Sequence, residues 1–153
     1  MRVWRITKPY PDKLSGMGGI YVSGRWHEKG HRIIYTSCTP SLAALEYLVH
    51  LDPTLAPSGL GLLQIDIPDD IAIQECDPST LTSNWRQYFP IPMELQKFGT
   101  KWLAENRTAI LAVPSAIIPI EKNYIINPAH PAMARITMVD EIDFSFDPRL
   151  LSH

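Results

Sequence analysis

Apolar and polar residues alternate along several short stretches of the chain, and this period of two residues is typical of half-buried β-strands. The alternation is clearest over residues 3–7, 61–67 and 142–146, which are predicted to form strands. A continuous apolar run at 109–113 has the length of a strand buried on both faces. Four further short runs have strand character and lie at 32–37, 71–74, 116–120 and 124–126.

Two segments show the signals of α-helices instead. Thr39 and Pro40 form a helix start, because threonine is a good N-cap and proline fits the first helical position. This helix is predicted to continue to about Leu51 and to stop before the next proline. Apolar residues recur at helical spacing over 93–106, which predicts a second helix, with Gly99 as a weak point inside it.

The balance of these elements favours an α+β fold. Strands outnumber helices, so we expect a mixed or largely antiparallel sheet core with flanking helices. Fourteen prolines spread along the whole chain argue against a helical bundle, because proline ends helices. No repeat or change of composition marks a boundary, and about 150 residues is a usual domain size. Residues 1–153 are predicted to form a single domain.

Composition and charge remove several classes of protein. Hydrophobic residues make up 45% of the chain and charged residues 20%, which are ordinary globular values. The formal net charge is −2 with no basic block, so nothing indicates direct binding of nucleic acid. No apolar run approaches the roughly 18 residues of a membrane span, and the first residues lack the apolar stretch of a secretion signal. Two cysteines without a close-spaced motif indicate reduced thiols, and we expect a cytoplasmic protein.

Candidate chemistry begins on the first predicted helix. Glu46 and His50 share one edge of a helix in which nearly every other residue is apolar. One interpretation is a solvated pair, which contributes about 0.2–0.5 kcal/mol. The other is a carboxylate at the rim of the core that faces a cleft and acts on a substrate. The residues alone leave both interpretations open.

Loops and strand ends supply further candidates. Arg25 lies beside the glycine-rich loop 12–24, where a guanidinium suits a phosphate, although a surface arginine is the simpler interpretation. Arg5 lies on the first predicted strand, and Tyr35 lies on the second, where an aromatic side chain more often packs in the core. Ser115 follows the most apolar strand, and strand ends open onto loops where functional side chains collect.

Known catalytic and metal motifs are absent. The sequence has no P-loop, no GxGxxG after a strand, no GxSxG and no zinc pattern. His27 and His31 have a spacing that suits a metal only on a helix, and Gly30 argues against a helix there, so we expect no metal site. Asn127 and His130 lie in a proline-bounded turn whose simplest role is to end a strand.

Three blocks of residues together resemble the RES domain, the toxin half of bacterial RES–Xre toxin–antitoxin systems. Each block is weak alone, but the ordered set is specific and covers the chain from about residue 3 to 150. The blocks are SGRW, IYTS and AALE (23–26, 34–37 and 43–46), then GTKWL (99–103), and then VPSA, NY and NPAHP (113–116, 123–124 and 127–131).

The resemblance implies a fold similar to that of ADP-ribosyltransferases and NAD+ as the substrate. The arginine, glutamate and serine that name the family match Arg25, Glu46 and Ser115, which are the implied catalytic residues. Three positions that the family uses around its pocket are matched by Arg5, Tyr35 and Asn127.

These residues suit cleavage of the nicotinamide–ribose bond, which passes through an oxocarbenium-like transition state. Glu46 would stabilise the positive charge on the ribose, while Arg25 and Arg5 would hold the pyrophosphate. Tyr35 would stack on nicotinamide, and Ser115 would bond a phosphate or the carboxamide. The reaction requires no metal.

The resemblance leaves several points open. Family members degrade NAD+ by hydrolysis or phosphorolysis, and some transfer ADP-ribose to a protein, so a protein ADP-ribosyltransferase is an alternative. A non-catalytic module that binds a nucleotide or a partner is another. The implied partner is an Xre-type helix-turn-helix antitoxin, which would make any contact with DNA. A homodimer also stays open, because the sequence identifies no exposed apolar stripe.

Overall fold

Seven strands form one sheet in the computed structural model, which describes residues 1–51 and 57–151. The order across the sheet is β4-β5-β6-β2-β1-β3-β7, with β4 parallel to β5 and every other neighbouring pair antiparallel. This mixed sheet confirms the predicted α+β class. The strands are β1 (Arg2–Thr7), β2 (Ile34–Ser37), β3 (Leu60–Asp66), β4 (Ile73–Glu75), β5 (Ile110–Pro114), β6 (Lys122–Ile126) and β7 (Thr137–Phe144).

Three α-helices and three 3₁₀ helices accompany the sheet in the described part of the chain. The prolines account for several helix starts, because α2 and each 3₁₀ helix have proline in the first turn. None of the helices within residues 1–51 and 57–151 is long and apolar enough to cross a membrane. The helices are α1 (Gly18–Tyr21), α2 (Pro40–Leu48), α3 (Met93–Glu105), η1 (Pro78–Thr80), η2 (Pro131–Arg135) and η3 (Pro148–Leu150).

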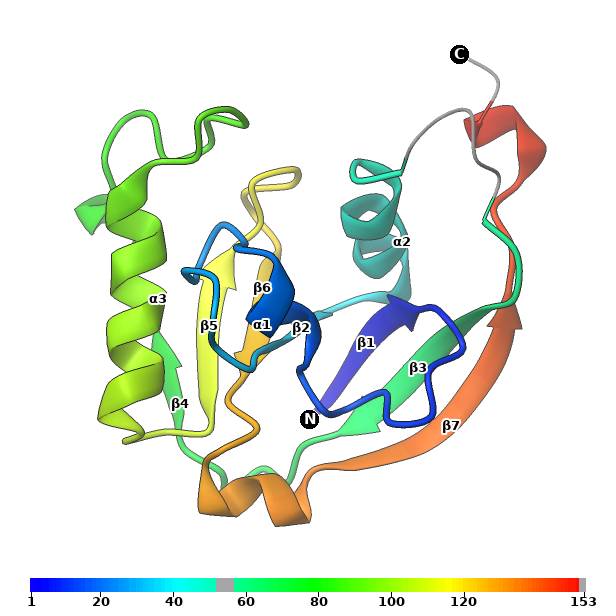
Figure 1. Ribbon diagram of the computed structural model, residues 1–153, viewed down its shortest axis with the longest axis horizontal. Helices are drawn as coiled ribbons and strands as arrows, with labels where there is room; N and C mark the ends of the chain where they lie inside the picture. The colour runs from blue at the N-terminus through cyan, green and yellow to red at the C-terminus, as the bar shows by residue number, and fades with distance from the viewer. Residues whose placement is uncertain (52–56, 152–153) are drawn as a thin grey trace.

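The two long helices pack on the same face of the sheet. Ser37 opposes both Trp4 and Asn123 across the sheet, so these side chains share a face. On this face α3 covers β5 and β6 through residues such as Trp102, and α2 covers β1 beside Ile6. Figure 1 shows α3 next to β5 and α2 above β1, with the middle of the sheet between them. Ser37 and Asn123 therefore lie on the strip between the helices.

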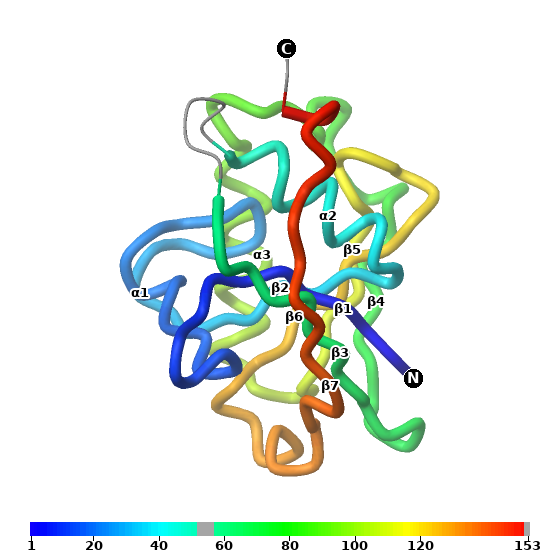
Figure 2. The backbone as a smooth tube through the Cα atoms, turned by 90° about the vertical axis from the view of Figure 1, so that its right-hand side faces the viewer, coloured from blue at the N-terminus to red at the C-terminus, as the bar shows by residue number. Residues whose placement is uncertain are grey.

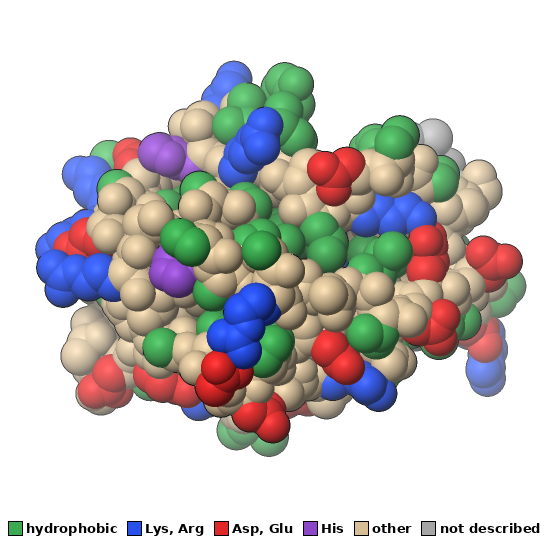
Figure 3. Space-filling model, turned by 90° about the horizontal axis from the view of Figure 1, so that it is seen from below, with side chains coloured by type: hydrophobic (Ala, Val, Ile, Leu, Met, Phe, Trp, Pro, Cys, Tyr) green, Lys and Arg blue, Asp and Glu red, His purple; other side chains and the backbone are tan. Residues whose placement is uncertain are grey.

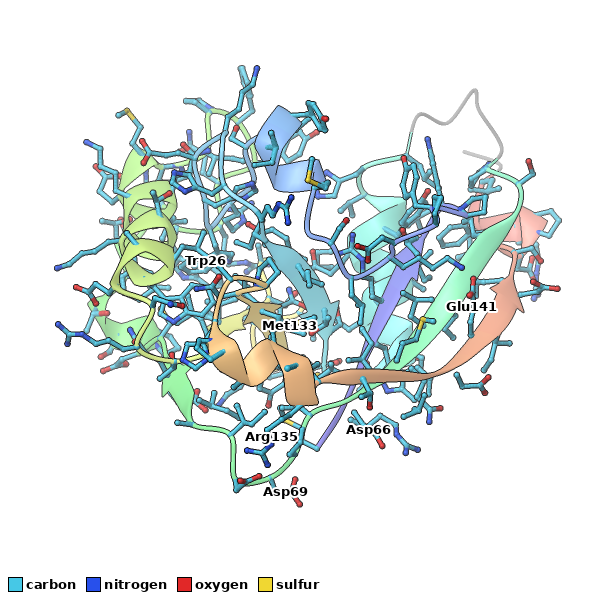
Figure 4. The ribbon with its side chains drawn as sticks, turned by 60° about the horizontal axis from the view of Figure 1, so that its bottom comes forward. Trp26, Asp66, Asp69, Met133, Arg135 and Glu141 are labelled. Carbon is cyan, nitrogen blue, oxygen red and sulfur yellow. The ribbon has the colours of Figure 1, made fainter. Side chains whose placement is uncertain are left out.

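The opposite face carries a continuous apolar core. Val3, Ile34 and Leu63 are fully buried there. Leu14, from the segment after β1, and Met133, from η2, pack against this cluster, and Figure 4 shows Met133 over the sheet. This face is filled by the protein's own side chains, so a ligand has room only on the other face or at an end of the sheet.

Two loops and helix α2 meet at one end of the molecule. The loop after β5 and the loop before α3 lie at the same end as α2 in both Figure 1 and Figure 2. This end therefore brings together residues that are about 70 positions apart in the sequence, since Glu46 of α2 contacts Ser115.

The sequence interpretation needs correction at several element boundaries. Residues 116–120 are not a strand, because the Ser115 hydroxyl accepts hydrogen bonds from the N–H groups of Ile117 and Ile118 and turns the chain at once. The first long helix ends at Leu48 rather than Leu51. The last strand begins earlier than predicted, at residue 137, and ends at 144. The glycine-rich loop contains α1, which the hydrophobic pattern does not reveal.

Gly99 is a packing requirement rather than a weak point. A Cβ atom placed there would lie 1.8 Å from the Trp26 carbonyl oxygen. Only glycine lets α3 approach the 24–27 segment this closely. The helix thereby fixes the loop that carries Arg25.

Candidate active site

Glu46 is the centre of a small hydrogen-bonded cluster between α2 and the sheet. Its carboxylate oxygen Oε1 accepts the Ser115 hydroxyl at 2.8 Å and the Asn123 side-chain N–H at 2.5 Å. Among residues 1–51 and 57–151, no group donates a hydrogen bond to the second oxygen, Oε2. Oε1 thus fixes the carboxylate, while Oε2 has no donor among the described residues.

The Ser115 hydroxyl donates to Glu46 and accepts two further hydrogen bonds from backbone N–H groups. The side chain is completely buried, and its oxygen accepts from the N–H groups of Ile117 and Ile118, each at 3.1 Å. Because both lone pairs are engaged, the hydroxyl hydrogen is directed to Glu46. These contacts indicate that Ser115 orients the Glu46 carboxylate.

Asn123 is a site residue that the sequence did not single out. Its side-chain oxygen accepts the Ser37 hydroxyl at 2.7 Å, which turns the amide nitrogen toward Glu46. Ser37 and Asn123 oppose each other across β2 and β6. The strand register therefore sets the second contact of the carboxylate. Asn123 belongs to the NY block, but an amide on a strand gives no chemical signal of its own.

Arg25 lies close enough to Glu46 for their charges to interact. Burial lowers the pKa of the half-buried guanidinium, and the Glu46 carboxylate raises it. Its Nη1 donates to the carbonyls of Trp85 and Gln87, at 2.7 and 3.0 Å. Neutral carbonyls from the loop before α3 therefore position this cation. Of the three residues that the resemblance implies to be catalytic, Ser115 bonds Glu46 directly and Arg25 interacts with Glu46 through its charge.

Tyr35 connects the sheet to the Arg25 segment through His27. His27 is buried, and its Nε2 lies 3.1 Å from the Val22 carbonyl, so Nε2 carries the hydrogen. Its Nδ1 then accepts from the Gly24 N–H and the Tyr35 hydroxyl, at 3.1 and 2.9 Å. The Tyr35 oxygen in turn accepts the Trp26 N–H at 3.2 Å. Burial raises the pKa of Tyr35 and lowers that of His27, so both are neutral.

Arg5 and Asn127 are not brought to Glu46. Arg5 opposes Leu63 on the other face of the sheet, and its Nη1 donates to the Tyr35 carbonyl at 2.9 Å. Its Nε is buried without a partner in the described structure, and burial lowers its pKa. Asn127 lies at the far end of β6 from Asn123, where its side chain bonds the ends of neighbouring loops. Neither residue contacts Glu46, Ser115 or Asn123, and each instead bonds a neighbouring part of the fold.

Comparison with known proteins identifies the family of the chain. The RES domain, as described by its family profile, matches residues 2–147. The chain belongs to the RES domain family. The resemblance carried by the three sequence blocks is thereby confirmed.

Individual relatives of this RES domain cover nearly its whole length. It is 39% identical over 152 residues to "Toxin Res" of Pseudomonas putida, covering 98% of this chain and 99% of that protein. It is 36% identical over 154 residues to a "Prs ADP-ribosylating toxin" of Sphingobium sp., covering 97% and 95%. A chain in the crystal structure of the M. tuberculosis MbcT–MbcA toxin–antitoxin complex matches with a TM-score of 0.78, at 17% identity, over 98% of this chain and 86% of that one. The last likeness shows the fold.

A hollow in this RES domain lies away from Glu46. It measures about 450 Å³ and lies on the underside, where Figure 3 shows side chains of both charges and Figure 4 labels several of them. Its charges are paired: Arg2 with Asp66 at 2.7 Å, Arg135 with Asp70 at 2.6 Å, and the N-terminal amino group with Asp69 at 2.5 Å. The arginines and aspartates of this hollow thus neutralise one another in pairs.

No cluster of three or more His, Cys, Asp or Glu side chains in residues 1–51 and 57–151 is arranged to hold a metal ion. His27, one member of the spaced pair, uses both ring nitrogens in the hydrogen bonds around Tyr35.

Proposed function

We propose that this RES domain is the toxin of a toxin–antitoxin pair and consumes NAD+ in the cytoplasm by breaking the nicotinamide–ribose bond. The observation that carries the proposal is the Glu46 carboxylate, with one oxygen fixed by Ser115 and Asn123 and the other open. The names of the relatives support a toxin, and one relative is named for ADP-ribosylation.

Glu46 is the group that acts on the ribose. As the bond between C1′ and the nicotinamide nitrogen breaks, nicotinamide leaves with the bonding electron pair and positive charge grows on the ribose ring. The free oxygen of Glu46 stabilises that charge and accepts a hydrogen bond from a ribose hydroxyl. Because Ser115 and Asn123 hold the other oxygen, the carboxylate is already oriented when the charge develops.

The remaining site residues bind and position. Arg25 presents its unused N–H groups to the pyrophosphate, with Nη1 anchored by two carbonyls. The Tyr35 ring stacks on nicotinamide, while its hydroxyl holds the Arg25 segment through Trp26. Arg5 positions Tyr35 from the opposite face of the sheet, by donating a hydrogen bond to its carbonyl. Asn127 stabilises the loop at the far end of β6.

The acceptor of ADP-ribose is water, phosphate or a protein side chain. Water or a side-chain hydroxyl releases its proton to solvent as its oxygen bonds C1′, whereas phosphate attacks through an oxygen that is already anionic. A free glycohydrolase or phosphorylase is the leading form of the proposal. A protein ADP-ribosyltransferase is the second candidate, which the named activity of the Sphingobium relative favours. The likeness to a toxin–antitoxin complex supports an antitoxin partner, and we propose that it is of the Xre helix-turn-helix type.

Cellular NAD+ levels test the proposal. Expression of the wild-type protein without antitoxin should deplete NAD+ and arrest growth, whereas Glu46→Ala at equal expression should do neither. Glu105→Ala is the matched control, because this partly exposed glutamate lies at the end of α3 and makes only long surface ion pairs, at 3.8 Å. Unchanged NAD+ in cells that produce folded wild-type protein would refute the proposal.

A further inference from the structure

The segment Trp85–Gln87 is tied to the Glu46 cluster at three points. The Arg25 guanidinium bonds the carbonyls of Trp85 and Gln87, on either side of Arg86. Arg86 itself donates from Nε to the carbonyl of Ala116 at 2.9 Å. Since Ala116 follows Ser115, which bonds Glu46, Arg86 is held beside the site by contacts from both sides.

Arg25 and Arg86 are held by neutral carbonyls rather than by ion pairs. Within residues 1–51 and 57–151, neither Arg25 nor Arg86 has a carboxylate within ion-pair distance. Arg2 and Arg135, by contrast, each have a carboxylate at less than 3 Å. Burial lowers the pKa of Arg25 most, the Glu46 carboxylate raises it, and the nearby charge of Arg86 lowers it further. Two like charges this close disfavour each other. Carbonyl bonds hold them in place despite this repulsion.

Both guanidiniums keep donors for a ligand. Arg25 uses only Nη1 and Arg86 uses only Nε for the bonds to carbonyls. The remaining N–H groups include the pairs that bind phosphate oxygens in bidentate geometry. Two fixed cations that repel each other are stabilised by a ligand with two neighbouring negative charges.

We propose that Arg86 is a second substrate-binding residue and that it clasps a diphosphate together with Arg25. The inference rests on the proposed function, since the diphosphate belongs to NAD+. Arg25 and Arg86 each bind one phosphate group, and the bond from Arg86 to Ala116 sets the distance between this clasp and Glu46. Arg86 is exposed, so its side chain does not pack in the core and its guanidinium is accessible to a ligand.

Calorimetric titration of ADP-ribose tests this inference in a Glu46→Gln background, where no turnover occurs. Arg86→Ala should weaken ADP-ribose binding by about ten- to a hundredfold, as expected for lost charge-assisted hydrogen bonds. Arg107→Ala, an exposed arginine after the far end of α3, should leave binding unchanged. Unchanged affinity in Arg86→Ala overturns the inference.

Arg86→Lys separates charge from loop anchoring. Lysine keeps the positive charge but cannot reproduce the planar guanidinium, so it should recover part of the affinity that alanine loses. Affinity as low as in Arg86→Ala would mean that the bond to Ala116 alone matters, which overturns the inference.

Inorganic pyrophosphate is the second probe and separates this inference from the proposed function. If the protein binds pyrophosphate in an Arg86-dependent way but releases no nicotinamide from NAD+, the diphosphate site stands and the proposed reaction fails. If neither pyrophosphate nor ADP-ribose binds, the diphosphate site itself is refuted.

Discussion

Charged side chains have charged partners at one end of the molecule and neutral hydrogen-bond partners at the other. On the underside, Arg2 and Arg135 each face an aspartate within 3 Å and line a hollow of about 450 Å³. At the other end, Arg25 is held by neutral carbonyls, and Glu46 by a hydroxyl and an amide. Neutral partners fix a charged group without cancelling its charge, so the second arrangement is suited to catalysis and the first to the surface. The size of a hollow is therefore a poor guide to function here.

Removal of the Ser115 hydroxyl should have the largest effect among the supporting residues. Ser115→Ala takes a donor from Glu46 and leaves the partly buried N–H groups of Ile117 and Ile118 without their acceptor. We expect kcat for NAD+ cleavage to fall by roughly a hundredfold and the free energy of unfolding by about 2 kcal/mol. Steady-state kinetics and urea unfolding measure the two effects. A kcat within twofold of wild type would show that Glu46 does not need this donor.

Asn123 should matter less, because it supplies one of the two donors and no turn contact. Asn123→Ala is expected to lower kcat by about tenfold, with a smaller loss in Ser37→Ala, since Ser37 acts only by orienting the amide. The ratio of the two losses is informative. If Ser37→Ala were the more damaging variant, the order of contacts proposed for the cluster would be wrong.

The His27–Tyr35 contact predicts a dependence on pH. Burial lowers the pKa of His27 below its ordinary value of 6.5, so the unfolded chain binds a proton before the folded protein does. Stability from the neutral imidazole is therefore complete above about pH 6.5 and is lost as the pH falls toward the lowered pKa. Urea unfolding between pH 5 and 7.5 should show this loss in the wild type and less of it in His27→Gln. Equal pH dependence in both proteins would exclude His27 as its source.

The underside should give the smallest effect. Arg135→Ala breaks an exposed ion pair with Asp70, and such pairs contribute little because water and salt screen them. Neither the melting temperature nor NAD+ cleavage should change measurably. A loss of cleavage in this variant would mean that the two ends of the molecule are coupled, against the contrast drawn above.

Much of the fold follows from local patterns in the sequence. Alternation identifies β1 and β3 almost to the residue, and the predicted cap on α2 is formed by Thr39, whose hydroxyl accepts the Leu42 N–H at 3.0 Å. The pattern fails at 116–120 because the Ser115 hydroxyl, a single side chain, reverses the chain there. Apolar residues in that loop resemble a strand although no strand pairs with them.

The site was predicted less completely than the fold. Arg25, Glu46 and Ser115 match the family's defining residues and do come together. Asn123 was missed because its role depends on strand register and on a contact across 77 positions. Arg86, the residue of the proposed diphosphate clasp, gives no signal in the sequence for a similar reason, since its carbonyl partner lies 30 residues away. Neither kind of long-range contact leaves a periodic signal in the sequence.

Product analysis of purified protein with NAD+ tests the central role of Glu46 most directly. Chromatography should show nicotinamide released by the wild type and at least about a thousandfold slower release by Glu46→Gln, with a second product that changes if phosphate is the acceptor. Transfer to a protein would instead appear as label from adenine-labelled NAD+ on an added protein. Well-folded wild-type protein that releases no nicotinamide, or Glu46→Gln that releases it at the wild-type rate, would contradict the proposed mechanism.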